Sequence, residues 1–145
     1  MKMHLVALAG LAIGVALAAV AQEQNAVNQQ ARQEIEGLIL KGDDAYNQNN
    51  PAAVAAQFTY DAIEVFGWQS RVDAASGQPA ISERYAFQLP SPGELSNKLI
   101  QLYAIGNEIC AVTEFQHVVL GRKGYSVRIY VREGDNWKIR MAYAN

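Results

Sequence analysis

The sequence predicts an α+β fold in which three helical segments pack on one side of an antiparallel sheet. Two observations support this prediction. Helical periodicity occurs only in the first part of the chain, and strand-like alternation interrupted by tight-turn residues fills residues 95–145. The composition agrees, because 50% of the 145 residues are hydrophobic and the net charge is −2, which distinguishes the chain from a disordered one. A single domain is expected at this length.

The amino terminus predicts a secretory signal peptide over residues 1–21. Lys2 provides the positive start, an apolar stretch follows, and small residues form an Ala-x-Ala site that ends at Ala21. The alternative is an uncleaved anchor, but the stretch is rich in alanine and falls short of the roughly 20 strongly apolar residues that a membrane span needs. We therefore expect cleavage before Gln22 and a periplasmic or secreted protein with no membrane span.

Two helices are expected first, behind a flexible lead-in. Residues 22–30 are polar, rich in Gln and Asn, and without an apolar period, so they form the lead-in. Residues 31–47 form the first helix, because apolar residues recur there in steps of three and four. These positions are Ala31, Ile35, Leu38, Ile39, Gly42 and Tyr46. Pro51 behind the Asn50 cap then opens a short helix that ends at Phe58.

A strand, a connecting segment and a third helix follow. Residues 60–68 are rich in β-branched and aromatic residues, and their alternation places Ile63 and Glu64 on opposite faces of a strand. Residues 69–77 are polar and predict a loop or an irregular hairpin. The third helix begins at Pro79 and ends before a Pro-Ser-Pro-Gly segment.

The remaining residues predict four antiparallel strands joined by tight turns. The strands span residues 95–105, 108–120, 125–132 and 137 onwards. Alternation in the last two places Ile129 and Met141 on an apolar face and Arg128 on the opposite face. We expect the three helices to cover the apolar face.

The order and spacing of four short segments carry a family resemblance. They are the Asn-rich turn with Pro51, Tyr60-Asp61-Ala62, Gly77-Gln-Pro-Ala-Ile81, and Gly134-Asp-Asn-Trp137-Lys-Ile139. With them, residues 31–145 resemble the nuclear-transport-factor-2-like (NTF2-like) superfamily, and most of all its SnoaL-like, or DUF4440-like, exported bacterial proteins. The resemblance implies a cystatin-like cone, in which helices and a curved sheet enclose a pocket open at one end. It also implies a homodimer formed through the outer face of the sheet.

The same resemblance implies that one known activity is missing. In the steroid-isomerase branch, the carboxylate base of the first strand falls on Phe66 of this sequence. The first-helix tyrosine falls on Gly42, and the protonated carboxylic acid falls near Ile129. None of the three can perform that reaction. Because the fold hosts many functions, the remaining site residues must be weighed individually.

Two residues are candidates for acid–base catalysis. Glu64 lies two residues before Phe66 and so shares its strand face, which would place a carboxylate inside the cone. An apolar pocket would raise the pKa of that carboxylate and suit it to proton transfer near neutral pH. His117 lies on a mostly apolar strand face and could relay protons beside Glu64. The alternatives are that Glu64 faces solvent and that His117 is an ordinary packed histidine.

Aromatic residues are candidates for binding a ligand, since they combine apolar area with a polar tip. They are Tyr46, Phe66, Trp68, Tyr85, Tyr103 and Tyr143. For each of them, ordinary core packing is the alternative. Arg128 could bind an anion, but cross-strand pairing with Glu114 on the outer face is the interpretation we favour.

Composition and motifs exclude several other classes. Twelve Lys and Arg against 14 Asp and Glu leave no basic excess for nucleic acid. The single cysteine, Cys110, excludes an internal disulfide and a cysteine-based metal cluster. His4 lies in the predicted signal peptide, so one imidazole remains and no metal site is expected. Because the chain has no Gly-rich phosphate loop or Gly-x-Ser-x-Gly elbow, we expect no cofactor.

Three functional hypotheses follow. We expect an exported domain whose cone binds a small, mostly apolar molecule without transforming it, because aromatic candidates are plentiful and the isomerase positions are lost. The first alternative is an acid–base enzyme of the isomerase, cyclase or dehydratase type that uses Glu64 and His117. The second is a dimeric protein-interaction module. The orientation of Glu64 distinguishes the first two hypotheses.

Overall fold

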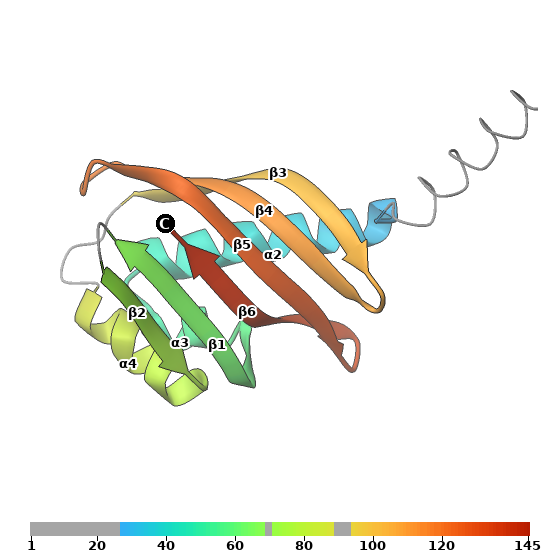
Figure 1. Cartoon of the computed structure of the whole chain (residues 1–145), viewed down its shortest axis with the longest axis horizontal. Coiled ribbons are helices and arrows are strands. Elements are labelled where there is room, and N and C mark those ends of the chain that lie inside the picture. The colour runs from blue at the N-terminus through green and yellow to red at the C-terminus, as the bar shows by residue number, and fades with distance from the viewer. Residues whose placement is uncertain (1–26, 69–70, 89–93) are drawn as a thin grey trace, which may run out of the picture.

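The computed structural model describes residues 27–68, 71–88 and 94–145, and the predicted signal peptide lies outside these ranges. In the described part, helices lie on one side of a six-stranded sheet (Figure 1). The helices are α2 (Gln29–Asn47), α3 (Pro51–Ala55) and α4 (Gln78–Gln88). The strands are β1 (Phe58–Trp68), β2 (Arg71–Ser76), β3 (Leu95–Ile105), β4 (Glu108–His117), β5 (Arg122–Glu133) and β6 (Asn136–Ala144). The predicted α+β class is confirmed.

Helix α2 crosses the inner side of the sheet and begins earlier than predicted. The side-chain oxygen of Asn28 accepts a hydrogen bond from the Ala31 backbone N–H at 2.8 Å, so this cap starts the helix at Gln29 rather than at Ala31. Its buried stripe includes Ile35 and Ile39. No helix of the described residues is long and apolar enough to cross a bilayer.

Helix α3 is shorter than predicted, and strand β1 is longer. Asn50 caps the helix as expected, with its side chain accepting from the Ala53 N–H at 3.0 Å. The helix ends at Ala55 because the chain joins the sheet almost at once. The Gln57 carbonyl already accepts a hydrogen bond from the Ile139 N–H at 2.8 Å.

The segment predicted as a loop or irregular hairpin contains strand β2, which pairs antiparallel with β1. The strand order is β2-β1-β6-β5-β4-β3, with β1 and β6 parallel and the other pairs antiparallel. The parallel pair brings the carboxyl-terminal strand beside the first strand. It thereby sets Glu64 next to Ala142.

Register shifts in β3 and β6 reverse part of the predicted face assignment. The pairing of β5 with β6 shifts between Ile129 and Tyr130, so Ile139 is buried whereas Met141 is 44% exposed on the outer face. Ile129 pairs with Met141 and lies on that face too. The prediction that the helices cover the apolar face of Ile129 and Met141 is therefore wrong. They cover the face that carries Arg128.

The connection between β4 and β5 also differs from the prediction. Strand β4 ends at His117, three residues before the predicted end, and residues 118–121 form the turn. Gly121 adopts φ +60°, a left-handed conformation that glycine adopts at no steric cost. Strand β5 then begins at Arg122 rather than at Tyr125. This shift brings His117 and the turn to the end of the sheet where the cavity lies.

Candidate functional site

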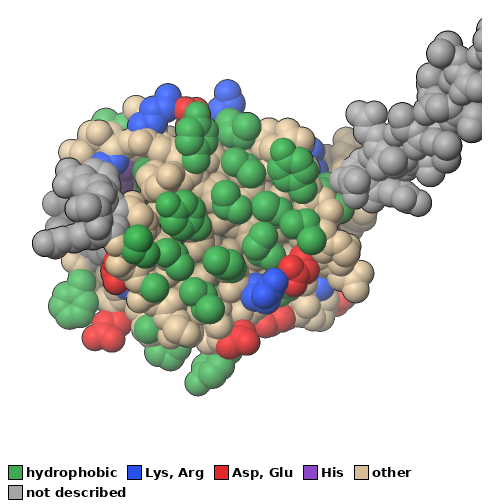
Figure 2. All heavy atoms as spheres, in the orientation of Figure 1, with side chains coloured by type: hydrophobic (Ala, Val, Ile, Leu, Met, Phe, Trp, Pro, Cys, Tyr) green, Lys and Arg blue, Asp and Glu red, His purple; other side chains and the backbone are tan. Residues whose placement is uncertain are grey.

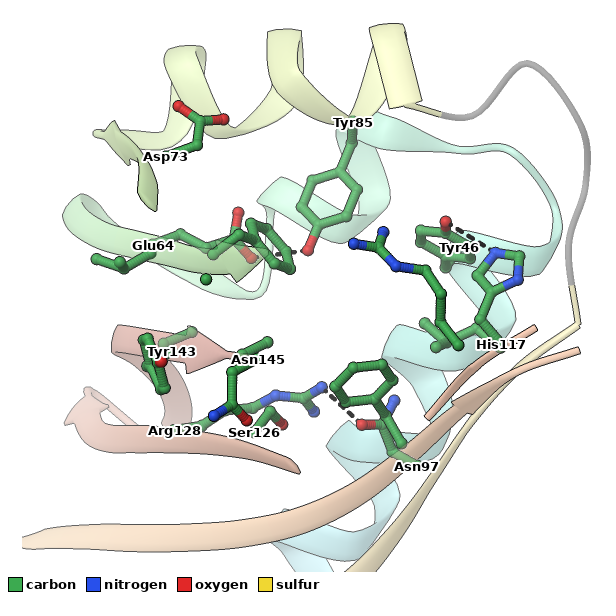
Figure 3. A pocket seen from close by; sticks show the side chains of 18 of the residues that line it. Tyr46, Glu64, Asp73, Tyr85, Asn97, His117, Ser126, Arg128, Tyr143 and Asn145 are labelled. Atoms are coloured by element: carbon green, nitrogen blue, oxygen red, sulfur yellow. Dashed lines mark hydrogen bonds between the residues drawn. The ribbon is translucent and has the colours of Figure 1, made fainter. Parts of the chain in front are cut away.

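A cavity of about 570 Å³ lies between the inner face of the sheet and the helices (Figure 3). Its wall is mostly apolar and includes residues of α2, α4 and all six strands. The volume falls within the roughly 300–1,000 Å³ of known small-molecule pockets. The fold therefore leaves room for a ligand of moderate size.

The floor of the cavity is a row of side chains across three neighbouring strands. Glu64 of β1 is in register with Ala142 of β6, and Ala142 is in register with Arg128 of β5. Because neighbouring strands are about 4.8 Å apart, Glu64 and Arg128 start from backbones roughly 10 Å apart. The methyl group of Ala142 between them leaves the space open.

Glu64 points into this cavity and is 3% exposed. Its Oε1 accepts a hydrogen bond from the Tyr85 hydroxyl at 2.7 Å. Its Oε2 lies 3.5 Å from Arg84 Nη1, an ion-pair distance, and accepts no hydrogen bond from the described residues. Burial raises the pKa of Glu64, although the hydrogen bond from Tyr85 and the charge of Arg84 act in the opposite direction.

Arg84 holds two acidic groups at this side of the cavity. Its Nη2 lies 3.1 Å from the carboxylate of Asp73, while its Nη1 faces Glu64. The guanidinium also lies over the Phe66 ring, 5.2 Å from its centroid. The Arg84 side chain is itself 7% exposed and does not line the cavity, and its single positive charge offsets part of the negative charge of the two carboxylates.

His117 and Tyr46 form a second polar pair. Tyr46 Oη lies 3.1 Å from His117 Nε2, and the Leu120 backbone N–H donates to His117 Nδ1 at 3.2 Å. Because Nδ1 accepts, the neutral ring carries its proton on Nε2 and donates it to Tyr46. Burial lowers the pKa of His117, which favours this neutral form. The hydroxyl hydrogen of Tyr46 is then available to a ligand.

The two predicted catalytic residues line the same cavity without touching. The ring of Tyr46 packs edge to face against the rings of Tyr85 and His117, at centroid distances of 6.0 and 5.6 Å. Tyr85 in turn holds Glu64, so the two tyrosines lie between Glu64 and His117 (Figure 3). A direct Glu64–His117 relay is absent, and Tyr46 is the nearer partner of His117.

Arg128 also lies inside, where the sequence interpretation did not place it. Its Nη2 donates to Asn97 Oδ1 at 3.2 Å. The predicted outer pairing of Arg128 with Glu114 is wrong, since Glu114 pairs with Lys123 at 2.9 Å. The physical reason is the same reversal of faces: Ser126 and Arg128 alternate on the inner side and the apolar residues of β5 face outwards.

Asn97 and Asp43 support Arg128 and were missed by the sequence analysis. The Asp43 carboxylate accepts hydrogen bonds from the backbone N–H and from Nδ2 of Asn97, at 2.7 and 2.5 Å. Burial raises the pKa of Asp43, although Asn97 acts in the opposite direction. The sequence does carry one signal for the burial of Asp43. This residue continues the stripe of Ile35 and Ile39 on the first helix at a spacing of four.

The aromatic residues that were predicted to bind a ligand lie in different places. Tyr46, Phe66, Tyr85 and Tyr143 line the cavity. Tyr103 does not: it is 50% exposed on the outer face because the pairing of β3 with β4 shifts between Leu99 and Gln101. The prediction for Tyr103 is therefore wrong. The side chain of Trp68 lies outside what the structure describes.

Among the described residues, no group of three or more His, Cys, Asp or Glu side chains is arranged to hold a metal ion. The cavity wall also carries side chains suited to proton transfer and hydrogen bonding. These side chains are Glu64, Tyr46, His117 and Arg128.

The raised pKa of Glu64 predicts a pH-dependent cost in stability. The folded protein holds the Glu64 proton more tightly than the unfolded chain, whose pKa is 4.5, so ionisation destabilises the fold as the pH rises above 4.5. The free energy of unfolding of Glu64→Gln, relative to wild type, should therefore increase from pH 4 to pH 8. Urea unfolding at a series of pH values measures this difference. If the difference in the free energy of unfolding between the two proteins does not change with pH, the raised pKa of Glu64 is contradicted.

Comparison with known proteins identifies the fold. No protein-family model and no curated protein sequence matches the chain. A domain of unknown function with a cystatin-like fold from Nostoc punctiforme superposes with a TM-score of 0.69 and 11% identity, over 82% of this chain and 78% of that one. An NTF2-like protein of unknown function from Silicibacter pomeroyi gives a TM-score of 0.69 and 11% identity, over 83% and 98%.

A third structure agrees. An NTF2-like protein of unknown function from Pseudomonas putida gives a TM-score of 0.64 and 18% identity, over 83% of this chain and 89% of that one. The chain therefore has the NTF2-like, or cystatin-like, cone fold that the sequence resemblance implied. At these identities the likeness concerns the fold alone. The narrower SnoaL-like or DUF4440-like assignment stays a prediction.

Proposed function

We propose that this domain is an acid–base enzyme that binds a small, mostly apolar carbonyl compound in the cavity and uses Glu64 as the proton acceptor. One observation carries the proposal. Glu64 is 3% exposed, lines the cavity, and has an oxygen, Oε2, that accepts no hydrogen bond from the described residues. Arg84 lies at ion-pair distance from Oε2 but does not fill the cavity, so this desolvated oxygen can accept a proton from a molecule bound beside it.

The proposed step is enolisation of the bound compound. The C–H bond next to the carbonyl breaks, its proton moves to Glu64 Oε2, and the electron pair moves onto the carbonyl oxygen. Tyr46 donates its hydroxyl hydrogen to that oxygen as negative charge develops. Tyr85 holds Oε1 at 2.7 Å and so fixes the carboxylate plane.

His117 has a positioning role in this proposal rather than the role of a direct relay. Its Nε2 lies 3.1 Å from Tyr46 Oη, and donation from His117 turns the Tyr46 hydrogen towards the ligand. The neutral imidazole that this requires is the form that its lowered pKa favours.

Hydrogen–deuterium exchange of a simple ketone tests the proposal without knowledge of the natural substrate. We suggest 2-tetralone, an apolar bicyclic ketone with acidic protons next to its carbonyl, followed by proton NMR in D₂O. The protein is expected to accelerate exchange at these carbons above the buffer rate. Exchange at the buffer rate, with 2-tetralone bound, would contradict the enzyme hypothesis.

Binding without transformation is the second candidate, and one observation favours it. The positions that match the oxyanion-binding residues of steroid isomerases present no polar side chain to the cavity. Gly42 faces Gln57, and Ile129 lies on the outer face in register with Met141. Saturable binding of 2-tetralone with no exchange would support this function.

We also propose that the protein acts outside the cytoplasm, in the periplasm or after secretion. The proposal rests on the charge, length and Ala-x-Ala site of residues 1–21. Mass spectrometry of the protein purified from its native host should give a mature chain that begins at Gln22. Retention of the complete amino terminus would contradict it.

A homodimer formed through the outer face of the sheet is proposed as the assembly. Figure 2 shows hydrophobic side chains spread over this face. One cross-strand row consists of Ile63, Met141, Ile129, Cys110 and Tyr103. Ile63, Met141 and Tyr103 are 46%, 44% and 50% exposed, so the row offers apolar area to a second copy.

Met141→Lys is expected to weaken this dimer by at least about tenfold, because a charge in the centre of an apolar interface must be desolvated. Light scattering after size-exclusion chromatography should show a shift towards the monomer mass. Leu40→Lys is the matched control, since Leu40 is 62% exposed on helix α2 and should leave the mass unchanged. A wild-type monomer at high micromolar concentration would contradict the dimer.

A further inference from the structure

We propose that Arg128 forms an anion-binding end of the cavity, and that the molecule bound there carries a carboxylate on its apolar body. The inference rests on the proposed small-molecule function and specifies the ligand class. Arg128 lines the cavity on the opposite side of Ala142 from Glu64. A ligand can therefore meet both side chains at once.

The side chains that lie close to the Arg128 guanidinium are neutral. Its Nη2 donates to the Asn97 amide oxygen at 3.2 Å, and the Tyr130 hydroxyl lies near the guanidinium. A guanidinium has five N–H donors in a planar fork, so a single bond to Asn97 leaves donors for a ligand. Two of them can meet both oxygens of one carboxylate.

No described carboxylate forms an ion pair with Arg128, in contrast to other arginines of the chain. Arg84 pairs with Glu64 and Asp73, and Arg140 pairs with Glu108 at 2.8 Å. Asp43 and Glu64 attract Arg128 only at longer range. A partly buried cation without a paired anion has a desolvation cost on folding, and binding an anionic ligand would offset that cost.

The supporting residues hold Arg128 in place. Both oxygens of the Asp43 carboxylate bond to Asn97, which fixes the amide that accepts from Arg128. Thr113 donates a further hydrogen bond to the same Asn97 oxygen at 3.1 Å. Asp43 thus forms hydrogen bonds with Asn97 and no ion pair with the Arg128 guanidinium. An arginine fixed in this way loses little freedom when it binds a ligand.

The charges that line the cavity are separated in a manner that orients such a ligand. Glu64 and Asp73 lie on the side of β1 and β2, where Arg84 pairs with both. Arg122 and Arg128 lie on the side of β5. A carboxylate is therefore attracted to the β5 side and repelled from Glu64, which leaves the rest of the molecule beside the proposed base.

Calorimetric titration with 1-naphthoate and its neutral amide, 1-naphthamide, tests the inference. The two compounds have nearly the same shape, so their difference isolates the charge. Wild type should bind 1-naphthoate at least about tenfold more tightly, as expected for a charge-assisted hydrogen bond. Arg128→Gln should abolish this preference and keep the affinity for 1-naphthamide. Arg140→Gln removes a positive charge outside the cavity and should preserve the preference for 1-naphthoate.

The outcomes separate the two proposals. Equal binding of the compounds to wild type would overturn the anion-binding role of Arg128 alone. Equal weakening of both compounds by Arg128→Gln would also overturn it, since that result indicates a structural role. If neither compound binds, the small-molecule function fails as well. Arg128→Lys, which keeps the charge but not the fork, should retain an intermediate preference and serves as the variant if Arg128→Gln does not fold.

Discussion

Replacing Glu64 with Gln is expected to lower the rate of 2-tetralone exchange by about 100- to 10,000-fold, the usual contribution of a positioned general base. The amide keeps the size of the side chain and can still accept the Tyr85 hydrogen bond, but it cannot take up the substrate proton. Binding of 2-tetralone should therefore persist. The variant should also be as stable as wild type or more stable near neutral pH, because the carboxylate pKa is raised in the folded state.

Two further measurements identify Glu64 as the base. The wild-type exchange rate should rise with pH along a limb whose midpoint lies above 4.5, since burial raises the pKa of Glu64 from that value. Glu114→Gln is the matched control, because Glu114 lies outside the cavity wall and pairs with Lys123. Exchange by Glu64→Gln at the wild-type rate would show that another group removes the proton.

Much of the fold could be predicted because local patterns determine it. The Asn50 cap and the period of α2 indicated the first two helices, and turn glycines such as Gly106 and Gly134 separate the strands. The strand β2 was harder, since it is only six residues long and Val72 is its single large apolar residue. It forms because β1 offers an edge with which it can pair.

The site was predictable only where a strand keeps its regular alternation. The inward orientation of Glu64 follows from alternation over β1, which the adjacent Ile63, 46% exposed, confirms from the opposite face. Arg128 was misassigned because apolar residues normally mark the covered face of a sheet. Here the apolar alternation of β5 marks the outer face, and Ser126 and Arg128 point inwards because they line the cavity.

The register shifts were not predictable from one sequence. A bulge in β3 turns Tyr103 outwards while Leu102 remains buried, and no glycine or proline marks that position. The link from Asp43 through Asn97 to Arg128 joins α2, β3 and β5, so it exists only after the sheet and the helix have packed. Hydrogen bonds between such distant segments leave no local signal.

Filling the cavity from its floor should weaken ligand binding strongly without unfolding the domain. Ala142 is 6% exposed, lines the cavity, and lies in register between Glu64 and Arg128. In the variant Ala142→Phe, the added aromatic ring would fill the space between Glu64 and Arg128, where the ligand must lie. Binding of 1-naphthamide should weaken by at least about 100-fold, which corresponds to roughly 2.7 kcal/mol.

The matched control is the next position in the same row. Ala111 pairs with Arg128 from β4 and is 0% exposed, but it does not line the cavity. Ala111→Phe must therefore overpack the core and should reduce the free energy of unfolding by about 1–3 kcal/mol, whereas Ala142→Phe enters open space and should cost less. Urea unfolding and calorimetry of both variants measure the contrast. Unchanged affinity for 1-naphthamide in Ala142→Phe would mean that the ligand binds elsewhere, and the proposed roles of Glu64 and Arg128 would fall together.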